Sequence, residues 1–228
     1  MKIEICTDSI TGANLAANSG AHRIELCSGL TLGGLTPSYS LSAKCAQIIE
    51  THVMIRHREG DFFYHKEEIK LMAQDIHQLA ASGIHGVVFG CLTKDFNLDI
   101  EACKFLLAAA KEQLVEVTFH RAFDFCESPI EMLHQLIELG FNRILTSGMQ
   151  PTAIEGADLI KKLVREAQGK IQIMAGSGVN ASNALELAET GIDALHFSSH
   201  KSRNAFMGMG LTNSPDKTKV ESIVSLFS

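Results

Sequence analysis

Tryptophan is absent from this chain of 228 residues, only four residues are proline, and aromatic side chains make up 6% of the total. So few aromatic rings argue against a surface on which the bases of single-stranded nucleic acid stack. Basic residues are not in excess either, because the formal net charge is −6 at pH 7. We therefore expect neither nucleic acid nor an anionic membrane surface as a partner.

The sequence also lacks an apolar run long enough for a transmembrane helix, and its first residues alternate like a β-strand instead of forming a secretory leader. We expect a cytoplasmic protein. None of the six cysteines belongs to a CxxC motif, and a cytoplasmic chain of this length does not need disulfides. Hydrophobic residues make up 46% of the chain, and no linker-like segment divides it. We therefore expect a single domain over residues 1–228.

Short apolar, β-branched segments alternate with longer segments of helical period. In residues 66–82, for example, apolar residues recur at i, i+3, i+7 and i+10, which is one face of a helix. The "SPIE" sequence at 128–131 combines a serine cap, a proline at the first helical position and a glutamate three residues after the serine. The predicted strands are 2–6, 23–27, 52–56, 86–90, 115–120, 143–146, 171–175 and 194–197, and the predicted helices lie near 9–19, 38–50, 66–82, 99–112, 128–139, 153–168, 182–190 and 217–227.

Strands that alternate with helices form parallel sheets, and eight of each is the count of a (β/α)8 barrel. We therefore predict an α/β fold that consists of a single (β/α)8 TIM barrel. The alternative is an open doubly wound sheet. That fold carries a glycine-rich phosphate loop after its first strand, and "CTDSITG" at 6–12 is not such a loop.

The first two predicted strands share a pattern, "KIEIC" at 2–6 and "RIELC" at 23–27. Side chains alternate between the two faces of a strand. The aliphatic residues of each strand then face the surrounding helices, whereas the glutamate and the cysteine point into the barrel. TIM-barrel active sites lie at the carboxyl ends of the strands, which is where Cys6 and Cys27 fall.

Buried carboxylates need partners, and charged residues near the other strand ends can supply them. "MIRHREGDFFY" follows the third strand, "TFHRAFD" ends the fifth, and the eighth carries His196. Convergence of these groups predicts acid–base chemistry on a substrate whose anionic group is held by arginine. A structural ion-pair network is the alternative. The candidate catalytic residues are Glu25, Arg56, His120, Arg121 and Asp124.

Glycine- and serine-rich turns follow the last two strands, "AGSGV" at 175–179 and "FSSH" at 197–200. Loops at these positions of a TIM barrel commonly bind phosphate through backbone N–H groups. Such turns also connect strands to helices without any ligand. The candidate residues for binding an anion or phosphate are Gly176, Ser177, Gly178, Ser198 and Ser199.

At these motifs the chain resembles the CutC family, which is named for copper homeostasis. The resemblance implies a cytoplasmic TIM-barrel protein associated with copper and assembled as a homo-oligomer, a dimer or tetramer. One loop departs from the family pattern, because His57 stands where the family has proline and Glu59 where it has a small residue. This substitution either loosens the loop or adds a ligand. The motifs that carry the resemblance are "EICTDS", "GAHRIELCSGLTLGGLTPS", "MIRHREGDFFY", "GVVFGCLT", "TFHRAFD", "RILTSG", "MAGSGV" and "LHFSS".

The first functional interpretation is Cu(I) binding, because Cu(I) is a soft ion that accepts two thiolates. Cys6 and Cys27 are the candidate metal ligands, with His120 or His196 as an assisting ligand, and no organic cofactor is expected. Ordinary packing of two small thiols is the alternative. The one close pair of methionines, in "FMGMG" at 206–210, is assigned to a flexible loop instead of a metal site.

The second interpretation is a metal-independent enzyme that acts on a small phosphorylated or carboxylated metabolite by acid–base chemistry. The third is a regulatory or scaffolding barrel without catalysis. The sequence does not decide whether the protein is an enzyme, and it names no substrate.

Overall fold

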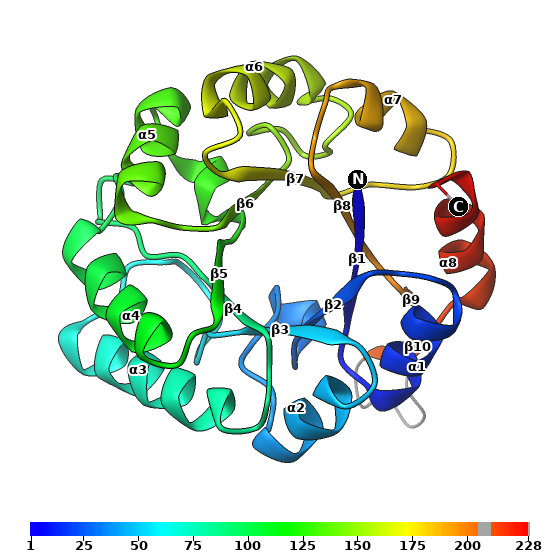
Figure 1. Cartoon of the computed structure of the whole chain (residues 1–228), viewed down its shortest axis with the longest axis horizontal. Helices are drawn as coiled ribbons and strands as arrows, with labels where there is room; N and C mark the ends of the chain where they lie inside the picture. Colours follow the sequence, from blue (N-terminus) through cyan, green and yellow to red (C-terminus); the bar gives the residue numbers. More distant parts are fainter. Residues whose placement is uncertain (205–210, 228) are drawn as a thin grey trace.

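The computed structural model describes residues 1–204 and 211–227. Eight parallel strands close into a barrel in the order β1 to β8, and helices surround it (Figure 1). This confirms the predicted (β/α)8 TIM barrel. The barrel strands are β1 (Lys2–Thr7), β2 (Arg23–Leu26), β3 (Glu50–Met54), β4 (Gly86–Phe89), β5 (Glu116–Phe119), β6 (Arg143–Thr146), β7 (Gln172–Gly176) and β8 (Ala194–Ser198).

The eight predicted helices are also present, each between or after the strands where the sequence placed it. The helix predicted at 153–168 begins only at Ala157, because Gly156 packs against the backbone of Ser147 and Gly148 at the start of the turn. No helix in the described part of the chain has both the length and the apolar composition needed to cross a membrane. The helices are α1 (Ile10–Asn18), α2 (Tyr39–Ala46), α3 (Lys66–Ala80), α4 (Ile100–Glu112), α5 (Pro129–Leu139), α6 (Ala157–Ala167), α7 (Ala184–Glu189) and α8 (Lys217–Val224), with short 3-10 turns at Leu30–Leu32, Arg121–Phe125 and Ser225–Phe227.

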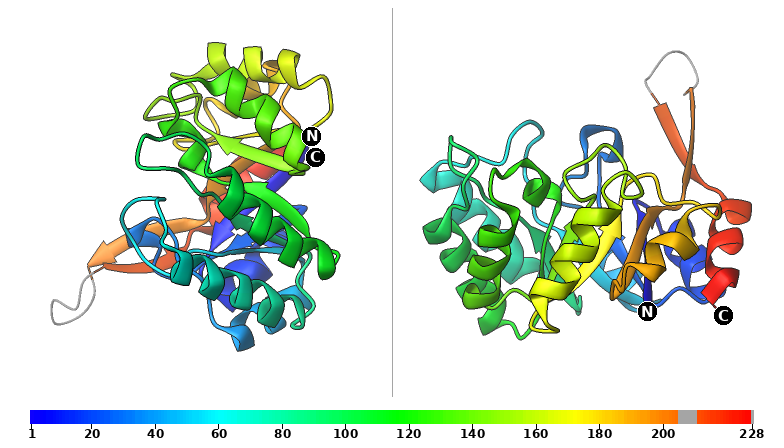
Figure 2. Two further views of the ribbon diagram at one scale, coloured as in Figure 1. Left: turned by 90° about the vertical axis from the view of Figure 1, so that its left-hand side faces the viewer. Right: turned by 90° about the horizontal axis from the view of Figure 1, so that it is seen from above.

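An antiparallel pair of strands follows the barrel, β9 (His200–Asn204) and β10 (Leu211–Pro215). The sequence predicted no strand between 198 and 216, and this part of the prediction is wrong. Neither strand contains an alternating run of apolar residues, so the pattern that indicated the barrel strands does not mark this pair in the sequence. The pair projects from the end of the barrel opposite to the two termini (Figure 2). The loop predicted for 206–210 lies outside the described residues.

The core has an outer and an inner layer. Ile3, Ile5, Ile24 and Leu26 are buried in the large cluster that includes helix residues such as Ala13. The inward face of the same strands belongs to a separate small cluster, formed by Cys6, Cys27, Met54 and Val88. The alternation predicted for the first two strands is therefore confirmed.

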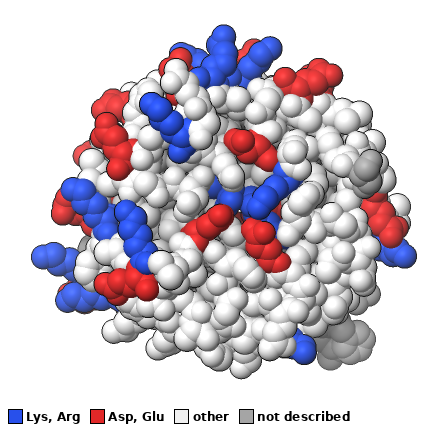
Figure 3. All heavy atoms as spheres, in the orientation of Figure 1, with Lys and Arg blue, Asp and Glu red and all other residues white. Residues whose placement is uncertain are grey.

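Charged side chains fill the barrel near the amino ends of its strands. Arg23 pairs with Glu4, and both are buried. Arg143 donates to Glu116 Oε2 at 2.9 Å and to Thr118 Oγ1 at 2.9 Å. Figure 3 shows acidic and basic side chains gathered at the centre of the face on which the termini lie. Because buried charges are unfavourable without partners, this network keeps the barrel interior polar but neutralised.

Candidate metal centre and ligand pocket

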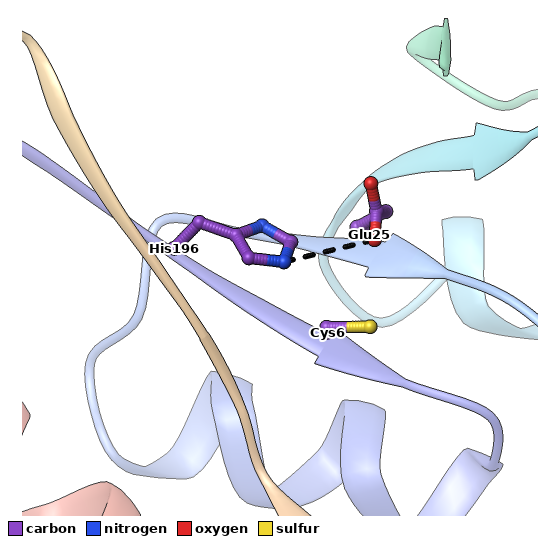
Figure 4. A group of neighbouring side chains, drawn as sticks. All are labelled: Cys6, Glu25 and His196. Atoms are coloured by element: carbon purple, nitrogen blue, oxygen red, sulfur yellow. Dashed lines mark ion pairs between the residues drawn. The ribbon is translucent and has the colours of Figure 1, made fainter. Parts of the chain in front are cut away.

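Three strands bring a thiol, a carboxyl group and an imidazole together at the other end of the barrel. Cys6 is the second-last residue of β1, Glu25 lies on β2 and His196 on β8, and β1 pairs with both neighbours. One ligand atom from each residue lies within 4.8 Å of the others. Their side chains converge on one point (Figure 4).

The imidazole of His196 is held between two carboxyl groups. Its Nδ1 lies 2.8 Å from Glu4 Oε1, and its Nε2 lies 3.7 Å from Glu25 Oε2. Burial alone would lower the pKa of His196, but Glu25, Cys6 and Glu4 together raise it well above its usual value. Burial would likewise raise the pKa of Glu4, yet Arg23 and His196 hold it far below its usual range. Glu4 is therefore an anion and His196 a cation at physiological pH.

The two cysteines contact one another at the end of this group. Cys27 is 1% exposed and donates from its Sγ to Glu25 Oε2 at 3.5 Å, while Cys6 is 8% exposed. A hydrogen bond from Cys27, helped by His196, lowers the pKa of the Cys6 thiol well below its usual value, and the same contact and burial raise the pKa of Cys27. Cys6 is thus the sulfur that loses its proton first.

Glu25 is the carboxyl group that stays protonated. Burial raises its pKa to about 8, even though the His196 cation opposes this shift, and the anionic Cys6 and Glu4 add to it. Its Oε1 has no hydrogen-bond partner among the described residues. A neutral carboxyl group beside a thiolate can give up its proton when a cation arrives.

This donor set fits a soft metal ion. Two thiols and an imidazole are ligands that Cu(I) accepts, and a carboxyl group is the least suited of the four. Gly34 lies directly over the sulfur of Cys27, and a Cβ at that position would come within 3.2 Å of it. With φ at +87°, Gly34 also has a backbone conformation that favours glycine.

A cavity of about 370 Å³ opens above the four residues, which is far more space than a metal ion requires. Its walls combine apolar side chains with several cationic ones. The residues that line the cavity include Cys6, Glu25, Cys27, Arg56, Phe62, His120, Arg121, Leu145, Ser177, Gly178, His196, Ser198 and Lys219.

Arg56 lines the cavity, but its guanidinium donates hydrogen bonds to backbone carbonyl groups of the surrounding loops. Its Nη1 donates to the carbonyl oxygens of Leu32 and Gly34, and its Nη2 to that of Gly60. Phe62 packs under the guanidinium, 5.2 Å from it. Arg56 therefore fixes the loops at the rim of the pocket, and its predicted role in gripping a substrate stays a prediction.

His120 is buried and neutral. Its Nδ1 accepts from the backbone N–H of Ala122 at 3.2 Å, which leaves the proton on Nε2, and Nε2 has no partner among the described residues. Burial and the nearby Arg56 lower the pKa of His120 to about 3. Such a group is a hydrogen-bond donor at physiological pH, and it is a weak general base.

Arg121 and Asp124 follow β5 as a pair, but only Arg121 lines the cavity. Asp124 accepts from Arg121 Nε at 2.8 Å and from the backbone N–H groups of Ser147 and Met149. The side chain of Asp124 is 4% exposed. Asp124 thus organises the turn after β6, and the structure does not bring it to the cavity.

The five residues predicted to bind an anion have different surroundings. Ser177 and Gly178 line the cavity, as does Ser198, whereas Gly176 and Ser199 do not. The hydroxyl groups also have partners within the protein, because Ser177 Oγ donates to the Pro151 carbonyl at 2.7 Å and Ser199 Oγ to that of Cys6 at 3.3 Å. The serine side chains are therefore poorly placed to form a phosphate cradle.

The two departures from the family loop lie outside the cavity. His57 Nε2 is 3.0 Å from Glu68 Oε1, and Arg58 donates to the same oxygen at 2.7 Å. Glu59 is exposed. His57 thus ties the loop to the first turn of α3, and neither residue lines the cavity of the site.

Sequence reasoning missed two contributors to the site. Arg23 shares the inward face of β2 with Glu25 and Cys27, and this spacing of two would have placed it inside the barrel. Lys219 comes from α8 and lines the cavity although it follows no barrel strand. No local pattern distinguishes Lys219 from the exposed Lys217 two residues earlier.

Comparison with known proteins agrees with this architecture. The model of the CutC family matches residues 1–201. A relative from Histophilus somni (strain 2336), named family protein CutC, is 50% identical over 210 residues, which cover 91% of this chain and 86% of that protein. A relative of the same name from Pasteurella multocida (strain Pm70) is 46% identical over 231 residues, covering 96% and 93%.

A solved structure extends the comparison. CutC from Streptococcus agalactiae, described provisionally as a copper homeostasis protein, superimposes with a TM-score of 0.81 at 34% identity and covers 86% of this chain and 97% of its own. A 3-hexulose-6-phosphate synthase, at 12% identity and a TM-score of 0.65, shares the barrel fold alone. From the match over 201 residues and from these relatives, the chain is a member of the CutC family.

Proposed function

We propose that this protein binds Cu(I) at the mouth of its barrel, through the sulfur atoms of Cys6 and Cys27 with the imidazole of His196 as an additional ligand. The observation that carries the proposal is the convergence of a thiol, an imidazole and a carboxyl group within 4.8 Å, with a second thiol in contact with the first. The name of the Streptococcus agalactiae relative points to the same metal.

The surrounding residues would adjust their protons when the ion binds. Cys6 already favours the thiolate, and Cys27 would release its proton, since a coordinating thiol is deprotonated. His196 must lose its Nε2 proton to become a ligand, and Glu4 on Nδ1 would keep the ring oriented. Metal binding should therefore release protons and weaken as the pH falls.

The test is a competition for Cu(I) with a chromogenic chelator under anaerobic conditions. The Cys6→Ala/Cys27→Ala variant should lose Cu(I), and Cys45→Ala is the matched control, because Cys45 is a buried thiol of the outer core layer. Unchanged affinity of the double variant would exclude this site. Circular dichroism of each variant checks that the barrel is folded.

A second candidate function is a metal-independent enzyme that acts on a small phosphorylated or carboxylated metabolite. It is favoured by the size of the cavity and by Glu25, whose burial raises its pKa to about 8 and so leaves a proton available for transfer. In this function Glu25 is the acid and Arg121 holds the anionic group. Mass spectrometry of metal and metabolites released from protein purified without added ligand would separate the two candidates.

Cytoplasmic location and assembly into a homo-oligomer stay proposals as well. Fractionation of cells that make the protein tests the first. Light scattering on the purified protein tests the second, and a monomer at all concentrations would contradict it.

A further inference from the structure

Lys219 is a half-buried cation that forms no ion pair with any described residue. It lies in the first turn of α8 and lines the cavity. Lys217 in the same turn pairs with Glu221 at 3.5 Å, whereas no ion pair within 4.0 Å includes Lys219 in the described part of the chain. Burial lowers the pKa of Lys219, and the charges of Asp216 and Cys6 oppose this shift. An anion in the cavity would supply the missing counter-charge.

Arg121 is the second cation that faces the cavity with donors to spare. Its Nε binds Asp124 at 2.8 Å and its Nη2 binds Ser147 Oγ at 2.8 Å. Among the hydrogen bonds of the described residues none uses Nη1, and the side chain is 40% exposed. The two bonds that Arg121 makes hold the guanidinium in place, so an oxygen atom arriving at Nη1 would meet an already oriented donor.

The two cations lie on opposite walls. Arg121 follows β5, and Lys219 is close enough to Cys6, at the end of β1, for their charges to interact. In a closed barrel of eight strands, β5 is four strands from β1 and faces it across the axis (Figure 1). The proposed Cu(I) site at Cys6 and Cys27 lies in the wall of the same cavity, next to His196 and Glu25.

His120 offers a hydrogen-bond donor to the cavity. It carries its proton on Nε2, since its Nδ1 accepts from the backbone N–H of Ala122, and Nε2 has no partner among the described residues. Phe62 and Leu145 supply apolar wall. A ligand that suits these walls has acceptor oxygens at its ends and a short carbon chain in its middle.

We propose that this cavity binds a small organic molecule with an anionic group at each end, one group on Lys219 and the other on Arg121. Carboxylate and phosphate groups share the required chemistry, and either can occupy either end. The proposal specifies the ligand of the cavity above the proposed Cu(I) site, but it does not rest on copper.

The experiment is isothermal titration calorimetry on the full-length, copper-free protein at low ionic strength. The probes are straight-chain dicarboxylates of increasing length, from malonate to pimelate, and the monocarboxylates of the same chain lengths. Glycerol 3-phosphate and 3-phosphoglycerate form a second pair of probes. Only 3-phosphoglycerate has a carboxylate at the end opposite to its phosphate, and comparison with the dicarboxylates reveals whether phosphate is preferred at one end. We expect one dicarboxylate or the phosphoglycerate to bind about tenfold more tightly than the counterpart that lacks its second anionic group, the value of one charged hydrogen-bonded contact.

Lys219→Gln should remove most of this advantage, which is about tenfold. The affinity for the probes with one anionic group should stay almost unchanged. Lys217→Gln is the matched control, because that side chain is 74% exposed and pairs with Glu221. Arg121→Gln should have an effect similar to that of Lys219→Gln. Lys219→Gln keeps Cys6, Cys27 and His196, so it should still bind Cu(I) in the chelator competition, and loss of copper binding and loss of anion binding are separate results.

The proposal is overturned if singly and doubly charged probes bind equally well at every length, or if none binds up to the solubility limit. Equal losses in the Lys219 and Lys217 variants would also overturn it, since they would indicate general electrostatic attraction instead of a site. Lys219 lies near the surface of α8, so its variant is expected to fold, and circular dichroism verifies this.

Discussion

His196 Nδ1 lies 2.8 Å from Oε1 of Glu4, a residue 192 positions away in the sequence. This contact joins the last strand of the barrel to the first and closes the ring. It also links the two ends of the barrel interior, because Glu4 is paired on its other side with Arg23, and His196 faces Glu25 and Cys6. The charge at the mouth of the barrel therefore depends on residues in its centre.

Replacing Glu4 with Gln should strongly destabilise the protein. The change leaves the buried Arg23 without its closest carboxylate, and breaking a buried pair in this way costs about 3 kcal/mol or more. It should also lower the pKa of His196, because one of the anions that raise this pKa is lost. Urea unfolding measures the first effect, and histidine NMR titration of the folded variant measures the second.

Glu101→Gln is the control for this prediction, because Glu101 is 86% exposed and its ion pair with Lys104 lies on the surface of α4. Its stability should differ little from that of the parent protein. A Glu4→Gln variant as stable as this control would show that the Glu4 contacts add nothing to the fold.

Glu25 should make the stability of the protein fall as the pH rises. Burial raises its pKa to about 8 in the folded state, so the folded form keeps a proton that the unfolded chain releases near pH 4. Unfolding therefore releases a proton between these values, and the free energy of unfolding decreases across this window and levels off above pH 8.

The Glu25→Gln variant cannot titrate at this position, so its stability relative to the parent should increase from pH 5 to pH 8, by on the order of 3 kcal/mol. Urea unfolding at the two pH values measures the difference. Glu59→Gln, on an exposed loop residue, should show no such trend. A constant difference between Glu25→Gln and the parent would mean that Glu25 is ionised in the folded protein.

Gly90 should be sensitive to a single added methyl group. A Cβ at this position would come within 2.7 Å of the Cε1 and Nδ1 atoms of His120, which is closer than such contacts allow. Gly90→Ala should therefore displace the imidazole and destabilise the protein by about 2 kcal/mol, the usual effect of overpacking. Thermal unfolding measures this value.

The cause can be checked in a His120→Ala background, where space becomes available and most of the cost of Gly90→Ala should disappear. The same losses in both backgrounds would attribute the effect to the backbone. In the parent protein His120 should not titrate between pH 5 and pH 8, because burial and Arg56 lower its pKa to about 3.

The sequence predicted most of the fold because the barrel is built from short, regular units. Alternation in β1 and β2 assigned each side chain to the inner or the outer layer, and periodicity assigned the helices. The β9–β10 pair was missed, since neither strand has the apolar alternation by which a strand is recognised in a sequence. Helix boundaries also shifted, as at Ala157, where close packing of Gly156 delays the first turn.

The candidate site was predicted in part. Strand ends indicated Cys6, Cys27, Glu25 and Arg121 at the mouth, and the structure places all four in the wall of one cavity. Asp124, expected beside them, instead organises a turn, because backbone N–H groups of the β6 loop reach its carboxylate first. The local turn decides which of two neighbouring charged side chains points into the cavity. The spacing of residues in the sequence does not carry this information.

By itself, the amino-acid sequence determined that eight strands form, that their alternate residues face an axis and that thiols and carboxyl groups lie on that inner side. These outcomes follow from local backbone geometry and from the burial of apolar side chains. Only the tertiary structure decided that His196 meets Glu4, that His120 is neutral and that Lys219 and Arg121 line the same cavity. Such contacts join residues distant in the chain, and the protonation of each group depends on the burial and charges that the closed barrel imposes on it.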